Sequence, residues 1–225
     1  MSNINLVRIK AVYNALEDLQ NKVVFVGGAI VSLYAKSKKF EIRPTDDIDV
    51  IVEILNYKER MELEEKLRSI GFQHDIYSSI ICRYKIKGII VDIMPTDDES
   101  IGFKNKWYSA GYKNAIDHKI DQRVTIKILN APYFIATKIE AYKGRGKNDG
   151  RTSKDFEDII FILENRNNIW SEMKESEAEL REYLKQEFQT FNNNPNIFEW
   201  IDCHVDRKYP PASYNILNEL NLFCK

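Results

Sequence analysis

The sequence has few cysteines and no long apolar run. Its three cysteines, Cys82, Cys203 and Cys224, are far apart in the 225 residues and form no CxxC pair, which is typical of a reducing compartment. No stretch approaches the 18 apolar residues of a membrane span. The first ten residues lack the apolar core of a secretory signal. We therefore expect a globular cytoplasmic protein that does not associate with membranes.

An excess of charge of either sign is also lacking. The chain carries 33 basic and 34 acidic residues, a net charge of −1, so it has no strongly basic footprint of a protein that coats nucleic acid. A transient nucleic-acid substrate stays possible. The local basic segments 104–119 and 138–154 are, on charge alone, most simply solvated faces.

The order of predicted elements indicates the architecture, since internal repeats are absent. The spacing of apolar residues predicts helices over 5–19, 29–35 and 57–69, and strands over 23–26, 47–53, 79–86 and 89–94. From residue 130 helical patterns take over, at 131–142, 153–164, about 172–191 and from near 195. We therefore expect an α+β fold with a mixed β-sheet flanked by helices in residues 1–125 and a helical region in 126–225. The glycine-rich loop 144–150 is a candidate ligand-facing segment.

Two acidic residues lie two positions apart on a predicted strand. Side chains alternate along a strand, so Asp47 and Asp49 point to one face while Ile48 points to the other. Neighbouring carboxylates repel one another unless a cation lies between them, and hard divalent ions prefer oxygen ligands. A magnesium site is therefore expected. An isolated Asp-x-Asp pair is more often an ordinary surface feature, so the context decides.

Asp92 is a lone acid in the apolar strand 89–94. Burial of an unpaired charge is costly, so this carboxylate also needs a cation. If the strand lies beside that of Asp47 and Asp49, three carboxylates converge, as a two-metal phosphoryl-transfer site requires.

A glycine pair follows the strand 23–26. At Gly27 and Gly28 the backbone N–H groups of a strand-to-helix turn could receive phosphates. A plain turn is the simpler explanation unless other residues support phosphate binding.

Gly27-Gly28, Asp47-Ile48-Asp49 and Asp92 together resemble the polymerase-β-type nucleotidyltransferase superfamily, and so imply its fold. Three further segments resemble the AbiEii/MenT group of nucleotidyltransferase-like toxins: Arg43-x-Thr45-x-Asp47-Ile48-Asp49, residues 136–147 and residues 153–158. The likeness spans residues 23–160. It implies that the Asp-x-Asp pair binds metal and that Lys138 and Asp155 serve nucleotide binding and activity.

The residues themselves support one of these implied roles. Lys138 has apolar neighbours at all four helical positions, namely Phe134, Ile135, Ala141 and Tyr142. An ammonium held there is expected to face an anion such as a triphosphate, although a lysine that snorkels from an apolar stripe is the alternative. Asp155 lies in the first turn of its predicted helix, where Thr152 to Asp155 has capping-box spacing. Without the resemblance it is a capping residue.

We therefore expect a magnesium-dependent (or manganese-dependent) enzyme that moves a nucleotide from a nucleoside triphosphate (NTP) to a hydroxyl. Asp47, Asp49 and Asp92 would hold metal, Gly27, Gly28, Lys138 and Arg43 would offset or cradle the triphosphate, and Thr45 would orient the loop before the aspartates. The resemblance implies RNA, at a tRNA end, as acceptor, and an antitoxin as a possible partner. Two alternatives stay open: a small-molecule (aminoglycoside-like) or protein acceptor, and a non-catalytic nucleotide-binding module.

Overall fold

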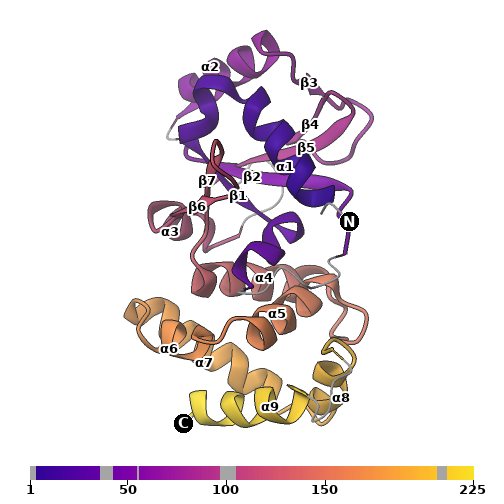
Figure 1. Cartoon of the computed structure of the whole chain (residues 1–225), viewed down its shortest axis with the longest axis vertical. Coiled ribbons are helices and arrows are strands. Elements are labelled where there is room, and N and C mark those ends of the chain that lie inside the picture. Colours follow the sequence, from indigo (N-terminus) through magenta and orange to yellow (C-terminus); the bar gives the residue numbers. More distant parts are fainter. Residues whose placement is uncertain (1–3, 36–42, 55, 97–104, 207–211) are drawn as a thin grey trace. The chain divides into compact units, whose positions relative to one another are not determined.

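A computed structural model describes residues 4–35, 43–54, 56–96, 105–206 and 212–225. The chain divides into two compact units. The first comprises Met1–Ser32 and Phe40–Asn130, and the second comprises Leu33–Lys39 and Ala131–Lys225 (Figure 1). The division falls after the last strand of the sheet, five residues beyond the boundary expected from the sequence, because that strand still pairs within the first unit.

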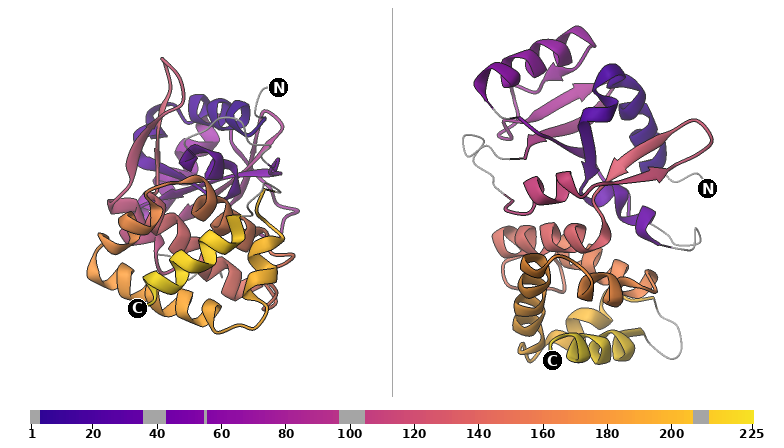
Figure 2. Two further views of the ribbon diagram at one scale, coloured as in Figure 1. Left: turned by 60° about the horizontal axis from the view of Figure 1, so that its bottom comes forward. Right: turned by 90° about the vertical axis from the view of Figure 1, so that its left-hand side faces the viewer.

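The first unit is built on a mixed sheet. Among the described residues its seven strands lie in the order β3-β4-β5-β2-β1-β7-β6. Their bounds are β1 Val23–Val26, β2 Asp47–Val52, β3 Gln73–His74, β4 Arg83–Ile86, β5 Ile89–Pro95, β6 Ile116–Lys119 and β7 Thr125–Ile128. The β6–β7 hairpin forms one edge of the sheet and extends away from the other strands (Figure 2).

Strand pairing follows the sequence pattern. All four residues of β1 are buried, as expected of a central apolar strand. In β2, Ile48 and Val50 are buried and the two aspartates between and before them are partly exposed, which is the predicted alternation. A two-residue turn joins β4 to β5, and Lys87 (φ 50°) and Gly88 (φ 77°) both adopt the left-handed conformation of a type I′ turn. The predicted mixed α+β fold is confirmed.

The first unit also contains helical segments. They are α1 Ile4–Ala15, the 3₁₀ helices η1 Glu17–Lys22 and η2 Gly28–Tyr34, α2 Tyr57–Ser69 and α3 Tyr108–Lys113. α1 and α3 pack against β2. α2 has the predicted bounds, begins at the capping residue Asn56 and is followed by Gly71 in the left-handed region at φ 94°. The segment after Gly27, expected as an α-helix over 29–35, is the 3₁₀ helix η2, whose last two residues cluster with the second unit.

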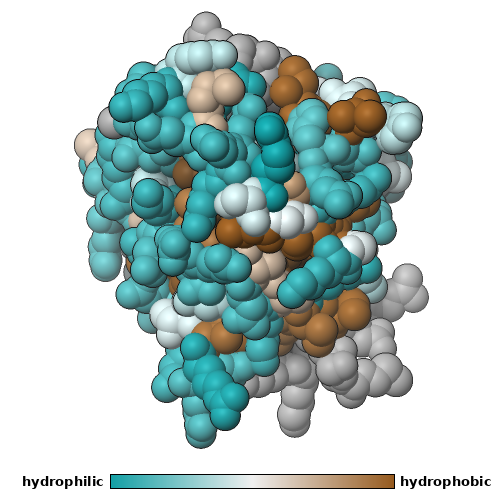
Figure 3. Space-filling model, turned by 90° about the horizontal axis from the view of Figure 1, so that it is seen from above, coloured by the Kyte–Doolittle hydropathy of each residue, from teal (hydrophilic) through white to brown (hydrophobic). Residues whose placement is uncertain are grey.

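A cavity of about 600 Å³ lies between α2 and the β3–β5 edge of the sheet. Tyr84 and Ile93 line it, and they alternate along their strands with Arg83 and Asp92. It therefore opens on the opposite face of the sheet from the predicted aspartate site. Figure 3 looks onto the α2 and β3 side of the unit and shows apolar side chains gathered among polar ones.

The second unit is helical, with bounds α4 Ala131–Arg145, α5 Lys154–Asn165, α6 Ile169–Lys174, α7 Ala178–Asn192, α8 Ile197–Asp202 and α9 Ala212–Phe223. Its core is aromatic. Phe156 contacts Tyr142, Phe191 and Trp200 with ring centroids 5.5 to 5.7 Å apart, and Phe188 packs edge-to-face on Phe223 at 5.8 Å.

Several elements differ from those expected. The helix predicted over 172–191 is two helices, because the chain turns at Ser176, whose hydroxyl donates to the Met173 carbonyl at 2.7 Å. The loop expected over 144–150 starts later, since α4 continues to Arg145. β3, β6, β7, α3 and α9 were not predicted. No helix in the described ranges is long and apolar enough to cross a membrane.

We expect the Phe188→Ala variant to lose about 3 to 5 kcal/mol of unfolding free energy, because a large ring that is 1% exposed leaves a cavity in the aromatic core. Leu222→Ala is the matched control, since Leu222 is 47% exposed on α9 beside the buried Phe223. Urea denaturation measures both. Equal losses for the two variants would contradict this core assignment.

Candidate active site

Two of the predicted site residues, Asp49 and Asp92, lie in one row that runs across four neighbouring strands. Val26 of β1 pairs with Asp49 of β2, Asp49 pairs with Asp92 of β5, and Asp92 pairs with Arg83 of β4. Side chains at paired positions point to the same face of a sheet. Asp47, two residues before Asp49, shares this face. The topology therefore brings together the aspartates that the sequence pattern selects.

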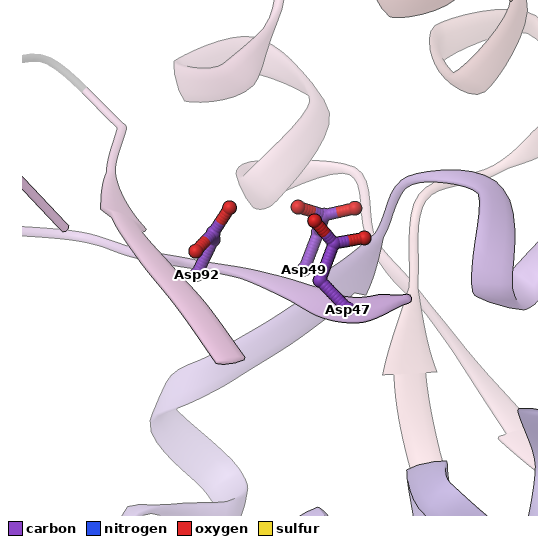
Figure 4. A group of neighbouring side chains, drawn as sticks. All are labelled: Asp47, Asp49 and Asp92. Atoms are coloured by element: carbon purple, nitrogen blue, oxygen red, sulfur yellow. The ribbon is translucent and has the colours of Figure 1, made fainter. Parts of the chain in front are cut away.

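The three carboxylates converge. One oxygen of each of Asp47, Asp49 and Asp92 lies within 4.8 Å of the others, and Figure 4 shows the carboxyl groups directed into one shared space. Asp92 is buried, whereas Asp47 and Asp49 are partly exposed. The cluster is thus open to solvent on the β2 side.

The donor set fits a divalent metal. All three groups offer carboxylate oxygens, the ligands that Mg²⁺ prefers, at bond lengths of about 2.1 Å. The three oxygens lie within 4.8 Å of one another, close enough for one such ion or a pair of ions to be held between them.

Arg83, which was not selected from the sequence, also contacts the cluster. Its Nε donates to Asp92 Oδ1 at 2.8 Å, and its Nη2 donates to Asp92 Oδ2 at 2.8 Å and to Asp47 Oδ2 at 3.0 Å. The sequence contained the signal for this contact. A two-residue turn at Lys87-Gly88 pairs Ile86 with Ile89, and counting three residues back and three forward places Arg83 opposite Asp92.

The negative charges of the cluster shift the pKa values of the neighbouring Arg83 and Cys82 side chains. The hydrogen bonds to Asp92, followed by the charges of Asp92, Asp47 and Asp49, outweigh partial burial and raise the pKa of Arg83 above its usual value, so its guanidinium stays charged. Burial, followed by the negative charge of Asp92, raises the pKa of the Cys82 thiol to about 11. Cys82 is therefore a neutral thiol at pH 7 and no thiolate nucleophile.

Gly27 is required by the packing around Asp49. Its φ of 73° lies in the left-handed region, and a Cβ built on it would lie 1.9 Å from Asp49 Oδ2. Glycine therefore lets the Asp49 carboxylate lie directly against the backbone at the end of β1. Gly28 follows as the first residue of η2. The expected phosphate-binding role of the two glycines stays a prediction.

The loop before β2 is held by α1. Asn5, fully buried on α1, donates to the Arg43 carbonyl at 3.1 Å and accepts from the Thr45 backbone N–H at 3.1 Å. Arg8 donates to the Thr45 carbonyl. The Thr45 hydroxyl donates to the carbonyl of Asp47 at 2.9 Å, and the expected role of Thr45 in orienting this loop stays a prediction. Asn5 and Arg8 were missed because a polar residue on an amphipathic helix gives no distinctive signal.

Lys138 lies in the second unit and has partners there. It is 6% exposed, and its Nζ lies 3.1 Å from Asp155 Oδ1 and 2.6 Å from Asp158 Oδ2. Arg145 adds a bidentate contact to Asp155, with Nε at 2.7 Å and Nη2 at 2.8 Å. The capping role expected at Thr152 and Asp155 is wrong, because Ser153 caps α5 by accepting from the Phe156 N–H at 3.3 Å.

The pairing shifts the pKa values of both partners. Burial alone would lower the pKa of Lys138, but the charges and hydrogen bonds of Asp158 and Asp155 outweigh the effect of burial and raise this pKa. Burial alone would raise the pKa of Asp155, but Arg145 and Lys138 lower it. The pair therefore stabilises the fold between the unfolded pKa values of about 3.9 and 10.4. This stabilisation is lost as the pH falls through the folded pKa of Asp155 or rises through that of Lys138. A role of the ammonium toward a nucleotide stays a prediction.

Comparison with known proteins rests on structure. No protein-family model and no curated protein matches the sequence. The antibiotic-resistance factor ANT(2'')-Ia, solved in solution, is similar in structure with a TM-score of 0.51 and 16% identity, over 84% of this chain and 94% of that one. The chain has the nucleotidyltransferase fold. An antigenic nucleotidyltransferase-like protein from Paracoccidioides brasiliensis has a TM-score of 0.48 and 14% identity, over 88% and 92% of the two chains.

A matched pair of glycine variants tests whether Gly27 is required by its close contact with Asp49. Gly27→Ala and Gly88→Ala both force alanine to positive φ, at a cost of roughly 1 to 2 kcal/mol, but nothing lies within 4 Å of a Cβ at Gly88. We expect Gly27→Ala to lose more unfolding free energy and to weaken Mn²⁺ binding, because Asp49 must move, whereas Gly88→Ala binds Mn²⁺ like the parent. Urea denaturation and Mn²⁺ titration measure these effects, and equal behaviour of the two variants would contradict the packing argument.

For Lys138→Met we expect a loss of about 3 to 5 kcal/mol of unfolding free energy, because two carboxylates that are 3% exposed lose their ammonium. Lys143→Met, on the same helix with its side chain 45% exposed, should lose about 1 kcal/mol or less. Denaturation together with nucleotide titration separates the roles. A Lys138→Met protein as stable as the parent but defective in nucleotide binding would show that the ammonium serves the nucleotide instead.

Proposed function

We propose that this protein is a divalent-metal-dependent nucleotidyltransferase that moves a nucleotide from an NTP to an acceptor hydroxyl. The observation that carries the proposal is the convergence of three aspartate carboxylates on one sheet face in the nucleotidyltransferase fold. The single charge of Arg83 cannot neutralise three carboxylates that repel one another, and an NTP complexed with Mg²⁺ supplies the further positive charge. We propose the first unit as the catalytic core and the second as its helical extension.

In this proposal Asp47, Asp49 and Asp92 would hold Mg²⁺, or Mn²⁺ in its place. A divalent ion supplies charge neutralisation of the triphosphate and orientation of the reacting oxygens. The Gly27–Gly28 backbone borders Asp49, and the loop carrying Arg43 and Thr45 leads into β2, so these residues are proposed to contact the triphosphate. Asp155 is assigned to nucleotide binding on the sequence resemblance alone, and Lys138 is assigned on the resemblance together with its four apolar helical neighbours.

The reaction is a displacement at the α-phosphorus. The acceptor oxygen forms a bond to this phosphorus, the bond to the bridging oxygen of the β-phosphate breaks, and pyrophosphate leaves with the electron pair. An aspartate of the cluster accepts the proton of the hydroxyl. Asp92 is proposed as this base, and it can take the proton only through an oxygen that Arg83 leaves available, since both of its oxygens accept from Arg83.

Two acceptors are proposed, each on a separate observation. The resemblance of residues 23–160 to the AbiEii/MenT group favours RNA, at a tRNA end, with an antitoxin as partner in the cytoplasm. The structural likeness to an antibiotic-resistance factor favours a small antibiotic molecule. Two alternatives remain, namely an enzyme that modifies a protein hydroxyl and a module that only binds nucleotide. The first transfers nucleotide to its acceptor, and the second does not.

We expect Asp47→Asn and Asp49→Asn to reduce nucleotide transfer by about a hundredfold or more, because a metal ligand that also stabilises developing charge is worth several kcal/mol. Asp117→Asn is the control, since Asp117 is an exposed acid on β6 of the same unit. The assay follows labelled nucleotide transfer in Mg²⁺. Both variants should melt at or above the parent temperature, because each removes one repelling charge; full transfer by either would contradict the metal assignment.

The acceptor is identified in the same assay. Each labelled NTP is incubated with Mg²⁺ and protein in the presence of total RNA, a panel of aminoglycosides or neither. Label that appears at RNA ends supports the RNA proposal, and label on an aminoglycoside supports the small-molecule proposal. Label on protein alone would indicate a protein acceptor, and no metal-dependent label in any mixture would favour the non-catalytic module.

A further inference from the structure

The aspartate cluster already contains a cation. Asp92 is 6% exposed in an apolar strand, so its carboxylate needs a positive partner within the protein. Arg83 supplies this partner through two parallel hydrogen bonds of 2.8 Å, the geometry that a guanidinium makes best with a carboxylate. The Arg83 side chain is 19% exposed and lies within the cluster.

Arg83 joins two strands of the cluster. The nitrogen Nη2 that contacts Asp92 Oδ2 also donates to Asp47 Oδ2 at 3.0 Å. One guanidinium group thereby holds a carboxylate of β5 beside a carboxylate of β2, although like charges at this separation repel. A divalent ion between the same carboxylates would compete for the same oxygen atoms of Asp47 and Asp92.

We infer that Arg83 is the resident counter-ion of the cluster, which keeps Asp47 and Asp92 together in the metal-free protein and competes with the divalent cation for them. The inference rests on the proposed function, since it assumes that the cluster takes a metal. Arg83 is a positioning residue in this account. It sets the metal affinity of the site and decides when the oxygens of Asp92 are free.

The metal and Arg83 compete because they bind the same carboxylate oxygens of Asp47 and Asp92. Metal binding by Asp47 and Asp92 must weaken or displace the Nη2 contacts, which are charge-assisted hydrogen bonds. Without Arg83 the three carboxylates lack this neutralisation, and they attract a divalent ion more strongly. The metal-free cluster, in contrast, becomes less stable because the repulsion between the carboxylates is no longer offset.

Mn²⁺ binding to the full chain tests the inference without a turnover assay, by calorimetry and by electron paramagnetic resonance of the free ion. We expect Arg83→Met to bind Mn²⁺ about tenfold more tightly than the parent, to melt at a lower temperature without metal and to regain more melting temperature on addition of Mn²⁺. Arg123→Met is the control, because Arg123 is exposed in the β6–β7 turn and its loss changes the net charge equally. It should bind Mn²⁺ like the parent.

Arg83→Lys keeps the charge but cannot make both parallel hydrogen bonds, so its Mn²⁺ affinity should lie between those of the parent and Arg83→Met. If Arg83→Met fails to fold without metal, folding on Mn²⁺ addition supports the inference, and the Arg83→Lys affinity still measures the competition. Parent and Arg83 variants with equal Mn²⁺ affinity would overturn the role of Arg83 while leaving the metal site intact. Absence of Mn²⁺ binding in every protein would overturn both this inference and the proposed function.

Discussion

The buried carboxylate of Asp92 is the constraint around which the first unit is organised. It lies in an apolar strand beside the strand of Asp47 and Asp49, where burial of a charge is tolerated only next to a cation. Arg83 meets this requirement within the protein, and its position follows from the tight turn between β4 and β5. The turn sets the strand register, and the register places Arg83 where it pairs with Asp92. A cation that enters the site therefore meets carboxylate oxygens that already accept hydrogen bonds from Arg83.

Much of the first unit could be predicted from the sequence. The apolar run of β1, the alternation in β2, the helix α2 and the Lys87-Gly88 turn are local patterns, and local patterns survive tertiary packing. Once β2 and β5 are neighbours, the convergence of their aspartates follows. The strands β6 and β7 were missed because each has only four residues and neither contains a continuous apolar run like that of β1.

The charge partners could not be predicted with the same success. The sequence showed that Asp92 and Lys138 each need an opposite charge, but it contained a signal for the partner only in the case of Asp92. For Asp92 the partner is Arg83, nine residues away across a hairpin, and register alone would have revealed it. For Lys138 the partners are Asp155 and Asp158 on the next helix, which depend on how α4 and α5 pack. An unpaired charge in an apolar pattern therefore indicates a need for a partner rather than the identity of a ligand.

We propose above all that Asp47, Asp49 and Asp92 form the divalent-metal site of a nucleotidyltransferase. A crystal structure of the protein with Mn²⁺ and a non-hydrolysable NTP analogue tests it most directly, because anomalous scattering locates manganese independently of the surrounding protein. We predict manganese bound to oxygens of all three aspartates, with the Arg83 Nη2 contact to Asp47 broken and the triphosphate at the same face of the sheet. Manganese bound elsewhere would contradict the metal site, whereas manganese on the three aspartates beside an undisturbed Arg83 bridge would overturn only the role of Arg83.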